Sequence, residues 1–246
     1  MSKISLHGFN NLTKSLSFSL YKLHYLRDIN ATQNYHAYVN EYFSANKLNV
    51  LLTNICQAIG GNVLNVAKQD YQPQGASVTL MISEEAQPTS LVAHLDKSHL
   101  CIHTYPEESP QNGTAIFRAD IELSTCGVIS PLKVINYIIK EFNADVIDID
   151  FRIRGMTRDK QGKKTFDIDD IDNISDFLSP EITDSFCINE HSFNEQNLFH
   201  AKLRKKEIKL SDYFFEADTK NFSDKEQRSI SEQLSKEIQE LFTNTK

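Results

Sequence analysis

Apolar residues follow two different periods along this chain of 246 residues, and each period predicts a different kind of element. Between residues 33 and 59 they recur at helical spacing, and Gly60-Gly61 ends the run. Residues 62–69 and 76–83 have the pattern of strands, with the turn sequence Gln72-Pro73-Gln74-Gly75 between them. Further strands are predicted over 89–95, 99–105 and 114–123.

The second half of the chain continues this mixture of strands and helices. Pro131 suits the first turn of a helix that ends near Phe142, and Ser130 is placed to cap it. Residues 146–154 alternate apolar and polar side chains, as a half-buried strand does. The remaining predicted elements are a turn at 159–162, a strand element within 193–208 and a closing amphipathic helix over 223–242. We therefore predict a single α+β domain, 1–246, with helices covering one face of mainly antiparallel strands.

Charge and cysteine usage exclude several functional classes. The chain has 26 basic and 33 acidic residues, a formal net charge of −7, so it lacks the basic excess of a nucleic-acid-binding protein. Its four cysteines form no C-x-x-C pair, which argues against a zinc knuckle. There is no apolar run of about 18 residues to span a membrane, and the N-terminal residues lack the apolar core of a signal peptide. We expect a cytoplasmic protein with reduced thiols that binds neither nucleic acid nor membranes.

Two short segments carry the reactive side chains. The first runs from His94 to Glu107 (HLDKSHLCIHTYPE), and the second runs from Ser124 to Pro131 (STCGVISP). Together they place a hydroxyl at Ser98, an imidazole at His103 and a thiol at Cys126 within 29 residues. Such a set suits nucleophilic attack followed by proton transfers.

These segments resemble the self-processing site of the pyruvoyl-dependent S-adenosylmethionine decarboxylases of the enterobacterial type. The resemblance covers the chain from near its first residue to about residue 205, and later residues resemble the family less closely. It implies a helix–sheet–sheet–helix sandwich. The other matching segments occur in the same order: LHGFNNLTKSLSF at 6–18, QDYQPQGASVT at 69–79, FRADIE at 117–122, and 137–157 with RIRG at 152–155.

The resemblance implies a proenzyme that cuts itself between Lys97 and Ser98. The Ser98 hydroxyl would attack the carbonyl of Lys97 and convert that amide into an ester. Strain at a tight turn and hydrogen-bond donors around the oxyanion would help this attack. The products would be a β chain, 1–97, and an α chain, 98–246, that begins with a pyruvoyl group made from Ser98.

The family pattern also assigns the two proton-transfer roles. His103 is expected to accept the Cα proton of residue 98 during processing, a step that suits imidazole near neutral pH. Residues five apart fall on opposite faces of a straight strand, so this role requires a bend or a strand end at Ser98, and the adjacent His99 is the rival base. Cys126 matches the proton donor for catalysis and is expected at a strand end near a helix. Cys101 falls inside an apolar strand and is expected to pack.

In this interpretation the chain is an adenosylmethionine decarboxylase, a carboxy-lyase. The pyruvoyl group would form a Schiff base with S-adenosyl-L-methionine, and the product would be S-adenosylmethioninamine, the aminopropyl donor for spermidine biosynthesis. Enzymes of this kind are often stimulated by Mg²⁺ and assemble as homo-oligomers of αβ units, often tetramers. Candidate contacts to the adenine, sulfonium or ribose of the substrate are Phe9, Tyr71, Glu84 and Glu122.

Three other functions share parts of this pattern. A pyruvoyl-dependent decarboxylase of ornithine or arginine would have the same fold and processing site, and only its pocket would differ. A non-enzymatic relative that regulates a catalytic partner would be expected to lack the serine, histidine or cysteine, and this chain keeps all three. A Cys–His hydrolase has less support, because no oxyanion loop or third residue accompanies the pair.

Overall fold

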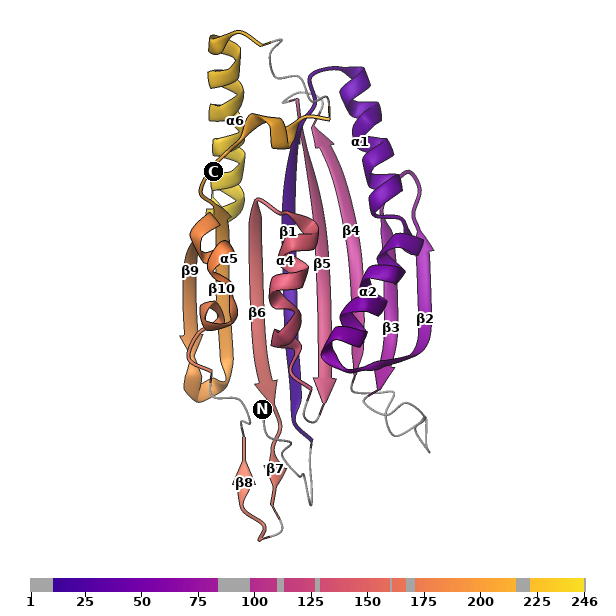
Figure 1. Cartoon of the computed structure of the whole chain (residues 1–246), viewed down its shortest axis with the longest axis vertical. Helices are drawn as coiled ribbons and strands as arrows, with labels where there is room; N and C mark the ends of the chain where they lie inside the picture. The colour runs from indigo at the N-terminus through magenta and orange to yellow at the C-terminus, as the bar shows by residue number, and fades with distance from the viewer. Residues whose placement is uncertain are drawn as a thin grey trace.

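The computed structural model describes residues 11–83, 98–109, 113–126, 129–159, 161–166, 171–215 and 222–245. Eight strands form one sheet in the order β2-β3-β4-β5-β1-β6-β10-β9, and all its neighbouring strands are antiparallel (Figure 1). The strands are β1 (Thr13–Tyr25), β2 (Asn62–Asp70), β3 (Ala76–Ser83), β4 (His99–Ser109), β5 (Thr114–Cys126), β6 (Val146–Arg154), β9 (Phe186–Phe193) and β10 (Leu198–Lys205), with β7 (Thr157–Arg158) and β8 (Lys164–Thr165) forming a separate pair.

Among the described residues, four helices lie over one face of the sheet, and a fifth lies over one end of the other face (Figure 1). Buried side chains of the first four join the main core, whereas α6 packs in a second cluster with Leu23 and Val146. Because strand side chains alternate between faces, α6 must lie opposite the other helices. The helices are α1 (Ile29–Tyr42), α2 (Ala45–Ile59), α4 (Ile135–Phe142), α5 (Pro180–Ser185) and α6 (Asp224–Thr243), with short 3₁₀ turns η1 (Pro131–Val134), η2 (Ile174–Phe177), η3 (Asn194–Gln196) and η4 (Leu210–Tyr213).

The α+β class and the mainly antiparallel arrangement are confirmed, but the central strand had no predicted counterpart. β1 pairs with β5 on one side and β6 on the other. Leu16, Phe18 and Leu20 of β1 point into the main core, and the serines between them face the opposite side. Alternation of this kind is the standard signal of a half-buried strand, so residues 13–25 could have been assigned from the sequence.

The helical spacing over 33–59 corresponds to two helices, with a break at Phe43-Ser44 that the sequence pattern did not predict, and the second helix ends before Gly60 as expected. Phe43 turns into the core, where its ring centroid lies 4.1 Å from that of Phe117. Ser44 is extended, with φ −62° and ψ 154°. The carboxylate of Asp70 then accepts the first amide of α2, from Ala45, at 2.7 Å. A long-range contact and a distant cap therefore divide one amphipathic run into two helices.

Most other predicted elements are confirmed, with shifted ends. The strands predicted over 62–69, 76–83, 99–105 and 114–123 are β2, β3, β4 and β5, and the strand predicted over 89–95 lies outside the described residues. The element within 193–208 is β10, whose partner β9 begins earlier. The helix at Pro131 starts as the 3₁₀ turn η1, and the Ser130 side chain makes no capping hydrogen bond. The closing helix α6 has a capping box formed by Ser223 and Glu226.

A fully buried carboxylate holds the upper end of the sheet in Figure 1 together. Asp145 accepts hydrogen bonds from the Leu23 amide at 2.8 Å, the Tyr213 hydroxyl at 3.0 Å and Lys22 Nζ at 3.2 Å. Lys205 Nζ lies 3.8 Å away. The carboxylate thus links β1, β10 and η4, and its charge is balanced as buried charges require.

A search of the described residues found no helix that is both long and apolar enough to cross a membrane. All four cysteines carry free thiols.

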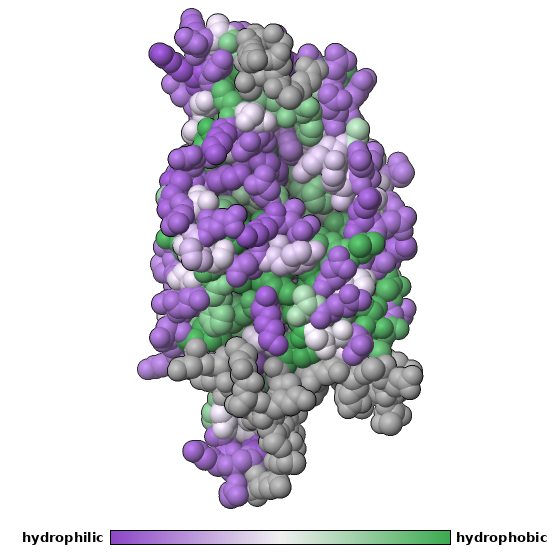
Figure 2. Space-filling model, viewed as in Figure 1, coloured by the Kyte–Doolittle hydropathy of each residue, from purple (hydrophilic) through white to green (hydrophobic). Residues whose placement is uncertain are grey.

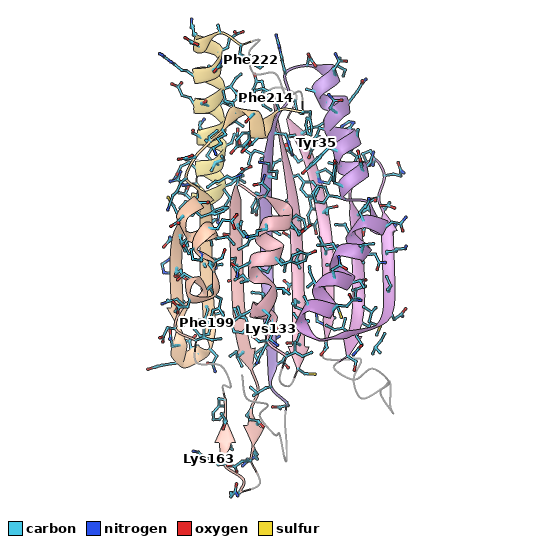
Figure 3. All side chains as sticks on the ribbon, in the orientation of Figure 1. Tyr35, Lys133, Lys163, Phe199, Phe214 and Phe222 are labelled. Carbon is cyan, nitrogen blue, oxygen red and sulfur yellow. The ribbon has the colours of Figure 1, made fainter. Side chains whose placement is uncertain are left out.

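His24 sits in an aromatic cluster at the upper end of the sheet, where Figure 3 labels Tyr35 on α1. Its ring lies 4.7 Å from Phe215, 4.9 Å from Tyr38 and 5.6 Å from Tyr35 between centroids. Nε2 has no hydrogen-bond partner in the part of the chain that the structure describes. Burial, helped by the charge of Lys22, lowers the pKa of His24 from 6.5 to about 3.

This neutral histidine should make the protein sensitive to acid. Between pH 6.5 and about 3 the unfolded chain binds a proton at residue 24 that the folded chain does not. The free energy of unfolding should therefore fall as the pH falls, by about 1.4 kcal/mol per pH unit from this group. Urea unfolding of the parent and of His24→Phe at pH 7, 6 and 5 should show a smaller loss in the variant. His191→Phe, which changes an exposed histidine, should keep the parental slope. Equal slopes in all three proteins would contradict the assignment.

Candidate functional site

Ser98 lies at the lower end of the sheet in Figure 1, directly before the first residue of β4. Only 5% of the residue is exposed. Its carbonyl accepts the Ile82 amide of β3 at 3.3 Å, which ties the backbone of Ser98 to the sheet. Lys97 and the rest of 84–97 lie outside the described residues. The serine therefore occupies a strand end, which is one of the two arrangements that the predicted processing role requires.

Cys126 meets Ser98 from the neighbouring strand. The β4–β5 ladder pairs His99 with Ser124, so the start of β4 and the end of β5 lie together. The hydroxyl of Ser98 lies 3.2 Å from Cys126 Sγ, and the Cys126 amide donates to Ser98 Oγ at 3.3 Å. Two of the three predicted residues, 28 positions apart, are thus in direct contact.

The end of β5 contacts the residues that directly precede η1 and α4. Thr125 Oγ1 donates to the Ile129 carbonyl at 3.1 Å, and Ser130 and Pro131 are buried. Figure 3 labels Lys133 of η1 near the lower ends of the central strands. The expected position of Cys126, at a strand end shortly before a helical turn, is confirmed.

Three basic residues of β1 and β6 lie at the end of the sheet that contains Ser98 and Cys126. None of the three was predicted from the sequence to be a site residue. Lys14, only 1% exposed, pairs in register with Thr125, the neighbour of Cys126. Arg154 pairs in register with Thr13, which pairs with Cys126, and its guanidinium donates to Ser15 Oγ at 2.9 Å. Arg152 lies opposite Ser15. Positive charge near this end favours carboxylates and oxyanions that form or bind there. Lys14 could have been identified from the sequence, because it occupies one of the apolar positions of an alternating strand, where a lysine is rare.

His103 is not brought to Ser98 in this conformation. It lies within β4, opposite Ser77 on β3 and Asp120 on β5. Five extended residues span about 16 Å, so its ring and Ser98 Oγ are far apart unless the start of β4 rearranges. His99 is adjacent to Ser98 and exposed. The contact expected between His103 and residue 98 is therefore absent from the described arrangement, and the assignment of the processing base stays a prediction.

Two of the four candidate substrate contacts can be placed. The Tyr71 hydroxyl is 2.8 Å from Ser77 Oγ, which lies opposite His103, and the Tyr71 residue is 40% exposed. Glu122 accepts a hydrogen bond from Ser17 at 3.0 Å, on the same face as His103. Phe9 and Glu84 lie outside the described residues.

The described residues fit a group made from Ser98 better than they fit a metal ion. Ser98 is buried, fixed at a strand end and in contact with a thiol. No group of three or more His, Cys, Asp or Glu side chains in the described ranges could hold a metal ion. Cys101, the alternative thiol, lies within β4, and burial raises its pKa, so it suits packing rather than proton transfer.

Comparison with known proteins yields consistent matches. The family model for S-adenosylmethionine decarboxylase matches residues 32–155. S-adenosylmethionine decarboxylase proenzymes of Photorhabdus laumondii and Yersinia enterocolitica are each 45% identical over 256 aligned residues, covering 98% of this chain and 97% of the relative. The crystal structure of the adenosylmethionine decarboxylase from Aquifex aeolicus is 18% identical with a TM-score of 0.40, covering 62% of this chain and 98% of the other.

Proposed function

The chain belongs to the S-adenosylmethionine decarboxylase family, and from this premise we propose that it processes itself at Ser98 into an active, pyruvoyl-dependent enzyme. The activity is the decarboxylation of S-adenosylmethionine, since the curated relatives that match nearly the whole chain are named decarboxylase proenzymes. The observation that carries the proposal is the contact of 3.2 Å between the Ser98 hydroxyl and the Cys126 thiol.

Processing begins with the Ser98 hydroxyl. Oγ attacks the carbonyl carbon of Lys97, the C–N bond breaks, and the acyl group moves from nitrogen to oxygen. The Cys126 amide and thiol orient this Oγ from the end of β5. A base then removes the Cα proton of residue 98, and the carboxylate of Lys97 leaves. Tautomerisation and hydrolysis release ammonia and complete an α chain of 98–246 beside a β chain of 1–97.

His103 is the proposed base, and His99 is its named rival. Both carry an imidazole, the side chain used most often as a general base. His103 acts in this scheme only if residues 98–103 leave the extended conformation, whereas His99 needs no rearrangement to stay near residue 98. A role for His103 therefore requires a rearrangement at the start of β4, and a role for His99 does not. Substituting each histidine in turn shows which of them acts as the base.

The completed pyruvoyl group supplies an electron sink for loss of CO₂ from the substrate. In this scheme Cys126 protonates the substrate Cα afterwards, and the support is that its sulfur lies beside the residue from which that group is made. Arg152 and Arg154 give the open face at this end of the sheet positive charge, which suits binding the substrate carboxylate before it is lost.

The proposal includes cytoplasmic location and assembly of αβ units. One face of the sheet has α6 over its upper end and polar side chains elsewhere, among them the pairs Arg118–Asp120 at 2.8 Å and Lys202–Asp148 at 3.3 Å. The described residues of one chain form one large sheet. The sandwich that the family resemblance implies would then place this face against a second sheet. Mg²⁺ stimulation and a role in spermidine synthesis remain expectations from the resemblance.

A pyruvoyl-dependent decarboxylase of ornithine or arginine is the alternative enzyme, and the family assignment does not favour it. Release of CO₂ from S-adenosylmethionine, ornithine and arginine at equal concentration separates the two. We expect turnover with S-adenosylmethionine alone.

Ser98→Ala should remain a single chain of 246 residues without activity, because alanine has no oxygen to accept the acyl group. Intact-mass measurement of the purified protein reports the outcome. Ser130→Ala is the matched control, since Ser130 is a buried serine nearby whose side chain makes no capping bond. It should yield two chains like the parent. Cleavage at 97/98 in Ser98→Ala would refute the mechanism.

His103→Ala should accumulate the ester, because the Cα proton of residue 98 has lost its base. Hydroxylamine should then cut the stalled protein at 97/98, since esters react with it much faster than amides. His99→Ala on the same strand is the comparison and should process at the parental rate. The reverse pattern, with His99→Ala stalled and His103→Ala normal, would assign the base to His99.

Cys126→Ala should process, because the residue 126 amide that donates to Ser98 Oγ at 3.3 Å is kept. Its decarboxylation rate should fall roughly 10²–10⁴-fold, the usual loss when a positioned acid is removed. Protonation at the carbon derived from residue 98 should become more frequent and leave an N-terminal alanine. The mass of the α chain followed during turnover measures this. Cys101→Ala should behave like the parent, and parental rate and partitioning in Cys126→Ala would rule out the thiol as the donor.

A further inference from the structure

A backbone amide of the neighbouring strand binds the carbonyl oxygen of Ser98. The donor is the N–H of Ile82, one residue before the end of β3, and the distance from nitrogen to oxygen is 3.3 Å. The bond continues the β3–β4 ladder, in which Leu80 lies opposite Leu100. Its acceptor, however, belongs to the residue at which we propose that the chain cuts itself, so this bond can do more than hold two strands together.

The Ile82 amide is held in place from several sides. The Ile82 side chain is buried in the main core, and Val63 of β2 pairs with the same residue from the side away from β4. β2 begins directly after Gly61, where a Cβ would lie only 3.0 Å from Sγ of Cys56 on α2. The helix therefore packs closely on the start of β2. A donor that is fixed in advance needs no reorganisation when charge develops on its acceptor.

The donor and the acceptor are both buried. Ile82 is 1% exposed and Ser98 is 5% exposed. Figure 2 shows hydrophobic residues among hydrophilic ones over the lower part of the helix-covered face, where helices cover this end of the sheet. A hydrogen bond that is shielded from water is electrostatically stronger than one at the surface.

The elimination step of processing places negative charge on this carbonyl oxygen. When the base removes the Cα proton of residue 98, the electron pair of the C–H bond moves into the adjacent carbonyl group, and its oxygen becomes an enolate. The pair then returns to form the double bond between Cα and Cβ. The bond from Cβ to Oγ breaks at the same time, and Lys97 leaves as a carboxylate. A proton next to an amide carbonyl is only weakly acidic, so this step gains most from a donor at the carbonyl oxygen.

We propose that the Ile82 amide is the oxyanion donor for the elimination at residue 98, a role that rests on the proposed self-processing. Its hydrogen bond strengthens as the oxygen gains charge, which lowers the barrier to loss of the proton. The Cys126 amide donates to Ser98 Oγ at 3.3 Å and so serves the oxygen that departs. β3 and β5 thus each supply one backbone donor to residue 98. This holds whether His103 or His99 takes the proton.

Replacing the amide of residue 82 by an ester tests the proposal. The α-hydroxy acid analogue of isoleucine, incorporated at position 82, removes the N–H and keeps the side chain. The acyl shift should still occur, and splitting into α and β chains should slow roughly 10²–10³-fold, the usual loss when one oxyanion donor is removed. Hydroxylamine should cut the accumulated ester at 97/98, as measured by intact mass. Deuterium at Cα of residue 98 should slow the splitting further, because loss of that proton limits the rate.

Two controls separate the lost donor from a weakened sheet. The same ester replacement at Leu80, opposite Leu100, removes the next ladder donor toward β4 and should leave the rate of splitting at the parental value. Ile82→Val keeps the N–H and should also split at the parental rate.

Several outcomes would overturn the role of Ile82. They are parental splitting in the Ile82 ester protein, equal slowing in that protein and either control, the absence of an isotope effect, or loss of splitting without a hydroxylamine-sensitive ester. The last result would assign the amide to the acyl shift instead. All of them leave the proposed function intact, whereas a parent that stays a single chain would refute the self-processing itself.

Discussion

The register between β4 and β5 is the constraint on which the proposed chemistry depends. It runs without interruption from His99↔Ser124 to Ser109↔Thr114, and it leaves Ser98 and Cys126 at adjoining strand ends. A slip of one residue would turn every side chain of β4 to the other face of the sheet. The pairing is held because Leu100 and Ile102 must face the helices, where both are fully buried. Hydrophobic burial along the ladder thus sets the distance between a hydroxyl and a thiol at its end.

The two ends of the sheet use charge in different ways. At the upper end, the Asp145 carboxylate accepts hydrogen bonds from the Leu23 amide, Tyr213 and Lys22. Together with the nearby Lys205, these groups balance its negative charge inside the fold. At the lower end, basic residues of β1 and β6 lie beside the strand ends that hold Ser98 and Cys126. β1 joins both ends, because Lys14 and Lys22 lie on one face of the same strand.

The two faces of the sheet also differ. The helix-covered face contains the main core, whereas the other face carries polar and charged pairs over most of its length. Figure 1 shows how α6 covers one end of that second face. Each face therefore offers a different kind of contact surface.

The sequence by itself was sufficient for the α+β class, most strands, the closing helix, and the positions of Ser98 and Cys126 at strand ends. These features depend on local periodicity, turn residues and a specific resemblance. The tertiary structure alone decided the break at Phe43-Ser44, because that break depends on the ring of Phe117 and the carboxylate of Asp70. It also decided that Lys14 lies in register with Thr125 and that His103 faces Asp120 rather than Ser98. Such neighbours are set by strand order and register, which join residues far apart in the chain and leave no mark in the local pattern.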